Sequence, residues 1–160
     1  MLVLLIAQGV ASQIHYKPIT LSEVVAASPT IVVVEDADPS SRNIVLPAGS
    51  VSMEVHLMRL RVVSVVRCPP GQVSPEQIIE VGGPDLEYRL MMMHRYNDRG
   101  ISISPIYAQY DGMPNTGRRV MFLHPCGVAG GDLGLCMLAD GAIESVEALD
   151  AVRGLLTVGD

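Results

Sequence analysis

The sequence feature that most constrains the fold is a long valine-rich segment, Met53–Val66, whose apolar pattern changes phase part-way along. Met53, Val55 and Leu57 alternate with polar residues, as one buried face of a β-strand requires. From Met58 onward the apolar residues fall on the opposite parity. A one-residue change of phase is typical of a β-bulge, which bends a strand and redirects its side chains. We therefore expect a long bent strand that takes part in both halves of a small barrel.

The composition favours one β-rich domain. The chain has 160 residues, of which 49% are hydrophobic and 18% charged, which is too apolar for a disordered chain. There is no Trp, one Phe and five Tyr, so Val, Leu, Ile and nine Met supply the bulk of the core. Val and Ile fit a pleated surface because their branched side chains are stiff.

The charge balance argues against nucleic acid and against an anionic membrane surface as partners. The net charge is −6, and Lys17 is the only lysine. Nucleic-acid binding needs a basic surface, because neutralised phosphates supply most of the affinity. Arg59, Arg61 and Arg67 fall on one side of the long strand, and with Glu54 nearby we interpret them as a solvent-exposed face.

Two helices are expected, one at each end of the domain. Thr20 and Glu23 form a capping-box pattern that starts a helix, and Pro29 ends it just after Ser28. Ser145 opens the final helix. Its apolar residues at helical spacing are Val146, Leu149, Val152 and Leu156.

The other apolar runs predict strands. They are Thr30–Glu35, Ile78–Val81, Tyr88–His94, Ile101–Tyr110, Arg119–His124 and Leu135–Leu138. Residues 36–50 are rich in Asp, Pro, Ser, Asn and Gly and predict a long loop, with a short extended piece at Ile44–Leu46. Asp140-Gly141 is a tight-turn signal, so Ala142-Ile143 should pair back onto the strand before it.

Four segments resemble parts of one known module. They are LSEVVAASPTIVVVE, MEVHLMRLRVVSVV followed by CPPGQ, TGRRVMFL, and ESVEALDAVRGLL. In this order they resemble the netrin-like module, the OB-type barrel shared with tissue inhibitors of metalloproteinases. The resemblance implies a single OB-like domain over residues 14–160, mainly β with two short helices, closed or partly open as a β-barrel. It also implies a general habit of binding proteins or ligands.

The chain departs from the inhibitors in one respect that bears on function. Those proteins chelate the zinc of the protease through the amine and carbonyl of an N-terminal cysteine. Here no cysteine precedes Cys68. Inhibition of metalloproteinases by that route is therefore not expected.

Residues 1–13 are either a remnant of a signal peptide or a first strand. Leu2–Ala7 is apolar, and Gly9-Val10-Ala11 resembles a small-residue cleavage site, although no positive charge precedes the apolar run. The run is too short for a membrane-spanning helix. A signal peptide would agree with an extracytoplasmic location, secreted or periplasmic.

The three cysteines are Cys68, Cys126 and Cys136. Cys126 and Cys136 flank a glycine-rich stretch, HPCGVAGGDLGLC, and are expected to close it as a disulfide. Cys68 could replace either of them, and the odd count leaves one thiol outside any intrachain pair. The alternative is three reduced, buried thiols that act as small hydrophobic residues.

An alternative function is a metal-binding or thiol-dependent enzyme centred on His124, Cys126 and Cys136, with His94 as a further ligand. Thiolate and imidazole suit zinc, and a Cys–His pair can act as a nucleophile when a group such as Asp132 orients the imidazole. The sequence contains neither paired Cys-x-x-Cys spacing nor a nucleophile elbow. We therefore expect no catalytic residue, no bound metal and no cofactor.

The expected function is non-catalytic binding, with a protein as the expected partner. Methionine side chains adapt to irregular partner surfaces, and tyrosines are enriched where proteins meet. The expected contact surface consists of Met91, Met92, Met93, Tyr107, Tyr110 and Met113. The high apolar content of so short a chain leaves a second alternative, a structural subunit of a larger assembly.

Overall fold

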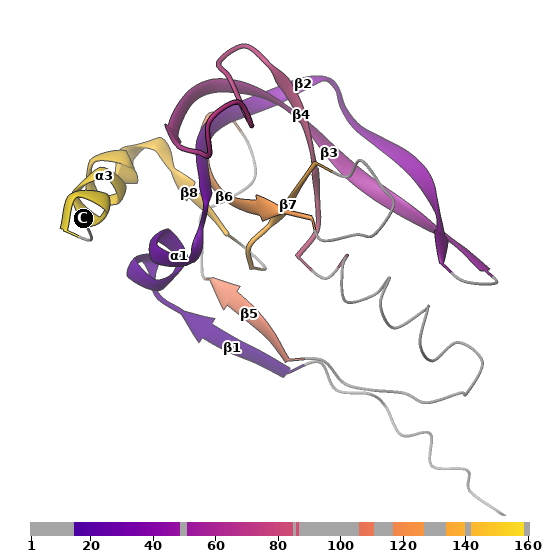
Figure 1. Ribbon diagram of the computed structural model, residues 1–160, viewed down its shortest axis with the longest axis horizontal. Coiled ribbons are helices and arrows are strands. Elements are labelled where there is room, and N and C mark those ends of the chain that lie inside the picture. The colour runs from indigo at the N-terminus through magenta and orange to yellow at the C-terminus, as the bar shows by residue number, and fades with distance from the viewer. Residues whose placement is uncertain are drawn as a thin grey trace, which may run out of the picture.

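The computed structural model describes residues 15–48, 51–84, 86, 106–110, 117–126, 134–139 and 142–158. These residues are mainly β with two short α-helices, as the sequence predicts (Figure 1). The elements are β1 (His15–Ile19), α1 (Leu21–Ala27), β2 (Thr30–Ala48), β3 (Val51–Arg67), β4 (Ile78–Gly82), β5 (Ile106–Tyr110), β6 (Arg119–Pro125), β7 (Leu135–Met137), β8 (Ile143–Ser145), the 3₁₀ helix η1 (Val146–Ala148) and α3 (Leu149–Val158).

The main sheet closes on itself. Its six strands follow the order β2-β3-β4-β7-β6-β8, and β2 also pairs with β6. Hydrogen bonds therefore run in a ring through five strands, β2, β3, β4, β7 and β6. The β4–β7 pair is parallel and the other pairs of the ring are antiparallel.

The long strand predicted around Met53–Val66 is confirmed as β3. Its buried positions change parity as expected, from Val55 and Leu57 to Leu60 and Val62. At this change of phase the extra residues lie in the neighbouring strand, because β2 has four residues between Asp36 and Ser41 where β3 has only Arg59. This irregularity turns the paired strands from one wall of the molecule to the next.

The loop predicted for residues 36–50 is wrong over most of its length. β2 continues to Ala48 through a cis Asp38–Pro39 peptide bond and pairs with β3 as far as Val51. The turn-forming residues Asp, Pro and Ser occupy the irregular part of the strand. Beyond it, Ser41–Ala48 and the first half of β3 form a hairpin that extends away from the helices (Figure 1).

Three apolar clusters hold the structure together. One fills the ring and includes Val34, Leu60, Val81 and Leu123. The second lies between the sheet and the two helices, which contact each other on one side of the ring (Figure 1). The third lies beneath the hairpin. Its buried members are Met53, Val55, Leu57, Leu86 and Cys136.

Both predicted helix starts are confirmed. The side chain of Thr20 accepts a hydrogen bond from the backbone of Glu23, and Glu23 accepts one from the backbone of Thr20. Ser145 caps η1, which continues directly into α3. Val146 differs from the prediction, because it is 37% exposed instead of packing with Val152.

Two strand pairings differ from what local sequence signals suggest. β8 pairs with β6, with Ile143 opposite Met121, and not with the strand immediately before it. β5 pairs in parallel with β1, a strand that the apolar pattern does not predict. The strand predicted at Tyr88–His94 and the turn at Asp140-Gly141 lie outside the described residues.

Candidate functional site

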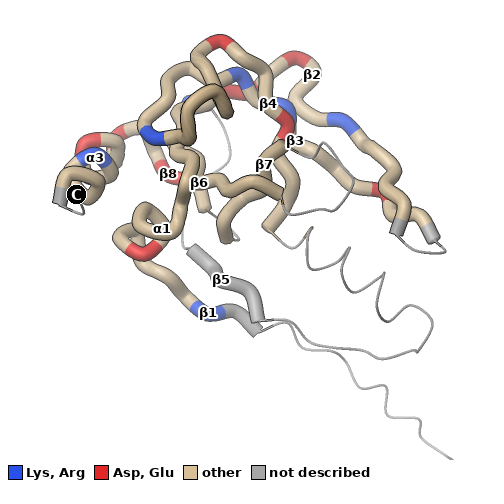
Figure 2. The backbone as a smooth tube through the Cα atoms, in the orientation of Figure 1, with Lys and Arg blue, Asp and Glu red and all other residues tan. Residues whose placement is uncertain are grey.

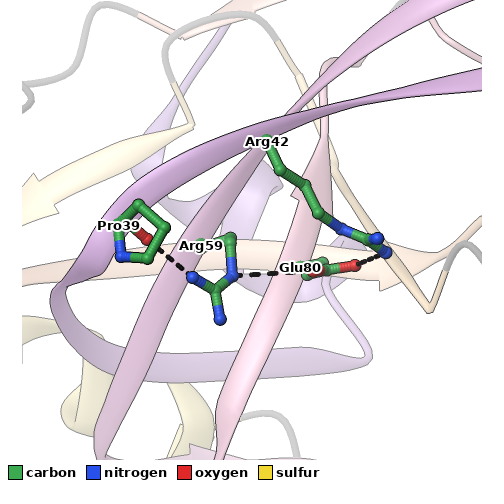
Figure 3. Close-up of polar contacts among 4 residues, drawn as sticks. All are labelled: Pro39, Arg42, Arg59 and Glu80. Carbon is green, nitrogen blue, oxygen red and sulfur yellow. Dashed lines mark hydrogen bonds and ion pairs between the residues drawn. The ribbon is translucent and has the colours of Figure 1, made fainter.

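A network of charged side chains lies on the outer face of β3 and β4. Arg59 of β3 is opposite Glu80 of β4, and both point outward because their neighbours Leu60 and Ile79 are buried. Glu80 contacts two guanidinium groups, through Oε2 to Arg42 Nη2 at 2.6 Å and through Oε1 to Arg59 Nε at 3.7 Å (Figure 3). This carboxylate is therefore already balanced by two positive charges.

The irregular part of β2 fixes the orientation of Arg59. Arg59 Nη1 donates a hydrogen bond to the carbonyl oxygen of Pro39 at 3.0 Å (Figure 3). With Glu80 on its other side, the guanidinium is held between two elements, and its side chain is 22% exposed. The hydrogen bond from Arg42 to Glu80 and the attraction between them raise the pKa of Arg42. Both guanidiniums stay positively charged at neutral pH.

A pocket of about 390 Å³ opens beside this network. It is lined by Arg59, Gln72, Gln77, Ile78, Ile79, Glu80, Gly134 and Leu135. These residues come from β3, from β4, from the segment before β4 and from the start of β7. Three adjacent strands of the ring thus contribute to one opening.

The two glutamines of the pocket use their amide oxygens within the protein. Gln72 Oε1 accepts a hydrogen bond from the buried hydroxyl of Thr30 at 2.6 Å. Gln77 Oε1 accepts from the backbone N–H of Ser74 at 3.0 Å and from its hydroxyl at 3.3 Å. Neither NH₂ group, which can only donate, has a hydrogen-bond partner among the described residues.

The glycine-rich stretch is closed by a disulfide as predicted. Cys126 and Cys136 are bonded, with their Cα atoms 5.2 Å apart. Cys136 is buried beneath the hairpin, while Cys68 is free and partly buried. His124 lies opposite Cys136 in the β6–β7 pair, but both sulfurs are used in the S–S bond. Among the described residues, His, Cys, Asp and Glu form no group of three placed to bind a metal ion.

The contact surface predicted from methionine and tyrosine stays a prediction. Met91, Met92, Met93 and Met113 lie outside the described residues, as do His94 and Asp132. Tyr107 and Tyr110 lie in β5, where the backbone pairs with β1. The structure therefore locates two backbone positions of that surface and none of its side chains.

The pocket beside Arg59 is not predicted from the sequence, although a signal for it exists. Arg59 and Arg61 do lie on the outer face of β3, where Arg61 Nη1 is 3.9 Å from Glu76. The short strand Ile78–Val81 follows β3 closely, and an antiparallel pair can place its outward Glu80 opposite an outward Arg. Arg42 cannot be added in this way, because it lies in the stretch predicted as a loop.

Charges of both signs alternate along the described strands of the ring. Arg residues are interspersed with Asp and Glu along β2, β3 and β4 (Figure 2). None of the described helices combines the length and the apolar character needed to cross a membrane. No protein-family model matches the chain, and no curated protein or solved structure matches it significantly. The chemistry of the site must therefore be inferred from its own residues.

Proposed function

We propose that this protein is a non-catalytic binding module of the OB type that works outside the cytoplasm and contacts its partner through the outer face of β3 and β4. The ring of five strands, with a long bent β3 shared between two walls, supports an OB-type barrel. The likeness to netrin-like modules remains part of this proposal and is an analogy at the level of the fold.

The observation that carries the proposal is the position of the pocket. OB-type barrels bind ligands on the face of their second and third strands and through adjacent loops. Counted along the ring, the second and third strands here are β3 and β4, which carry Arg59 and Glu80 at the mouth of the pocket. Pockets with a few fixed polar groups among apolar ones are typical of binding sites.

The disulfide supports the location outside the cytoplasm. Cys126–Cys136 is of a kind that persists in oxidising compartments and is rare where thiols are kept reduced. Thiol counting on protein isolated without reductant should find one free thiol per chain. Three free thiols in protein from its native source would contradict this location.

The alternative of a metal-binding or thiol-dependent enzyme needs a thiolate at Cys126 or Cys136, and the disulfide bond between the two sulfurs leaves neither of them as a thiolate.

The alternative of a structural subunit predicts a stable assembly, so the mass of the protein in solution tests it.

A photo-crosslinking residue on β4 tests the binding face. Benzoylphenylalanine in place of Ile78, which is 44% exposed at the pocket, should give discrete adducts in the extracytoplasmic fraction of the native source. The matched control is the same residue in place of Val146, which is 37% exposed on η1. Equal adducts at both positions, or none at Ile78, would overturn the proposal.

The predicted methionine and tyrosine surface has a test of its own. Met92→Asp and Tyr107→Asp should each weaken capture of the same partner while folding stays intact. Unchanged capture in both variants would remove that surface and leave the β3–β4 face as the contact.

A further inference from the structure

We propose that the pocket on the outer face of β3 and β4 binds a carboxylate group, presented by an acidic segment of a protein partner. This inference rests on the proposed binding function and names the chemistry that the site recognises. It follows from three properties of the lining: its charge, its hydrogen-bond donors and its apolar wall.

The charged network beside the pocket carries one positive charge in excess. Arg59 and Glu80 line the pocket, and Arg42 contacts Glu80 from outside the lining, so the negative charge of Glu80 offsets only one of the two guanidiniums. Arg59 Nη1 donates a hydrogen bond to the carbonyl of Pro39, and Nε makes an ion-pair contact with Glu80 at 3.7 Å. Its other terminal nitrogen points away from both partners (Figure 3). A guanidinium has five N–H donors, and a carboxylate matches those that remain.

The uncharged polar groups of the pocket are also donors. The amide oxygens of Gln72 and Gln77 accept hydrogen bonds from Thr30 and Ser74, and the NH₂ groups of these two lining residues have no partner in the described part of the chain. The side-chain acceptors of the lining are these two amide oxygens and the carboxylate of Glu80, and each of them contacts a donor within the protein. A ligand rich in acceptors satisfies the NH₂ donors, whereas a ligand rich in donors meets only acceptor side chains that already have a partner in the protein.

The apolar wall favours a carboxylate on a carbon chain over a free inorganic anion. Ile78, which is 44% exposed, lines the pocket together with Ile79 and Leu135, whose side chains belong to the core of the ring, and the methylene groups of a glutamate side chain can pack on Ile78. The net charge of −6 disfavours long polyanions such as nucleic acid. A short acidic peptide carries few charges, so the negative protein repels it less, and it can still contact the residues that line the pocket.

Calorimetric titration with two peptides tests the inference. The probes are tetraglutamate and tetraglutamine, both with blocked ends, at low ionic strength so that screening is weak. The wild-type protein should bind tetraglutamate and should not detectably bind tetraglutamine. Sodium sulfate is the third probe, and it should bind more weakly than tetraglutamate.

Two arginines on one strand give a matched pair of variants. Arg59→Met should weaken tetraglutamate binding about tenfold, since it removes charge-assisted hydrogen bonds but keeps an apolar stem. Arg61→Met removes an equal charge two residues along the same face but outside the lining, and should leave affinity within about twofold. If Arg59→Met does not fold, Gln77→Leu removes a donor without touching Arg59 and should also weaken binding.

The outcomes separate this inference from the proposed function. Equal affinity for the two peptides, equal affinity for sulfate, or equal effects of Arg59→Met and Arg61→Met would overturn the carboxylate assignment. If crosslinking at Ile78 still succeeds, the binding face stands and only the ligand chemistry is wrong. Failure of both experiments rejects the face as well.

Discussion

Arg119 is a buried cation whose pairing joins two strands of the ring. It is only 3% exposed, and its Nη2 lies 2.6 Å from the carboxylate of Asp36 on β2. Its Nη1 donates to the carbonyl of Gly117 at 2.9 Å, while Nε has no partner among the described residues. A buried charge is costly unless it is paired, so Asp36 is needed to keep Arg119 in place.

Two neighbouring ion pairs between β2 and the start of β6 allow a direct comparison. Asp36→Asn removes the charge that balances buried Arg119 and should lower the free energy of unfolding by about 1–3 kcal/mol. This loss is smaller than that expected for a fully buried ion pair, because Asp36 itself is partly exposed. Glu35→Gln breaks the exposed pair with Arg118 and should cost less than about 1 kcal/mol. Urea unfolding measures both, and equal losses would contradict the role given to Arg119.

Glu23 makes the capping box sensitive to pH. Hydrogen bonds from the backbone and side chain of Thr20 lower the pKa of Glu23 below its ordinary value of 4.5. A lowered pKa in the folded state gives stability that is present above pH 4.5 and is lost as the pH falls through the folded pKa. Glu23→Gln keeps the capping hydrogen bonds but has no proton to take up. Unfolding of this variant should vary less with pH below 4.5, and an unchanged profile would contradict the prediction.

At the scale of elements, Gly82 marks a close approach between β4 and the cluster beneath the hairpin. A Cβ atom there would lie 2.6 Å from Leu86 Cδ2 and 3.2 Å from Cys136 Sγ, and the disulfide restrains that sulfur. Gly82→Ala should therefore lower the free energy of unfolding by about 1–2 kcal/mol. Gly154→Ala, within α3 and with open space around it, should stabilise by about 0.5–1 kcal/mol. Thermal unfolding of the two variants should shift in opposite directions.

The disulfide should stabilise mainly through the unfolded chain. It closes a short loop with a sequence separation of 10, for which loop-closure entropy gives about 2–3 kcal/mol. The double variant Cys126→Ala and Cys136→Ala should lose this amount in denaturant unfolding. Cys68→Ala, which alters a partly buried free thiol, should lose less. A larger loss for Cys68→Ala would contradict this account.

Local signals in the sequence predict some elements and miss others for physical reasons. The start of α1 is predictable because Thr20 and Glu23 are three residues apart and act on one helix turn. Strand residues 36–43 are not, because Pro39 and its polar neighbours favour turns. They are extended because Asp36 and Ser41 pair with distant residues of β3, and because Pro39 and Arg42 contact Arg59 and Glu80. The partner of β8 is missed because it is chosen by the sheet and not by the nearest turn.

At the scale of the whole molecule, two distant pairings close the ring. Thr30 of β2 lies opposite Leu123 of β6, and Val81 of β4 lies opposite Leu135 of β7. Apolar periodicity predicts each of these strands but cannot give their order, since every buried strand has a similar pattern. The candidate site is likewise predictable only in part. Arg59 and Glu80 lie on two strands that follow each other in the sequence, so their pairing can be expected, whereas Leu135 joins the lining only when β7 docks beside β4.

Amide hydrogen exchange should divide the molecule into two stability classes. Amides in the β2–β6 pair should exchange only by global unfolding, because their opening breaks the ring. Within the hairpin, Ser41–Ala48 of β2 pairs only with β3 among the described residues. The amides of Ser41–Ala48 should therefore exchange earlier, through local opening. Native-state exchange at rising denaturant measures this order. Earlier exchange in β6 than in the hairpin would contradict it.

The distance along the chain between β2 and β6 also affects biogenesis. A chain delivered N-terminus first would present β2, β3 and β4 while the strands that cover their outer edges are still to come. Uncovered strand edges invite association with other chains. A chain that stops short of Leu123 would keep such edges permanently, so premature termination should yield aggregates and not a smaller folded product.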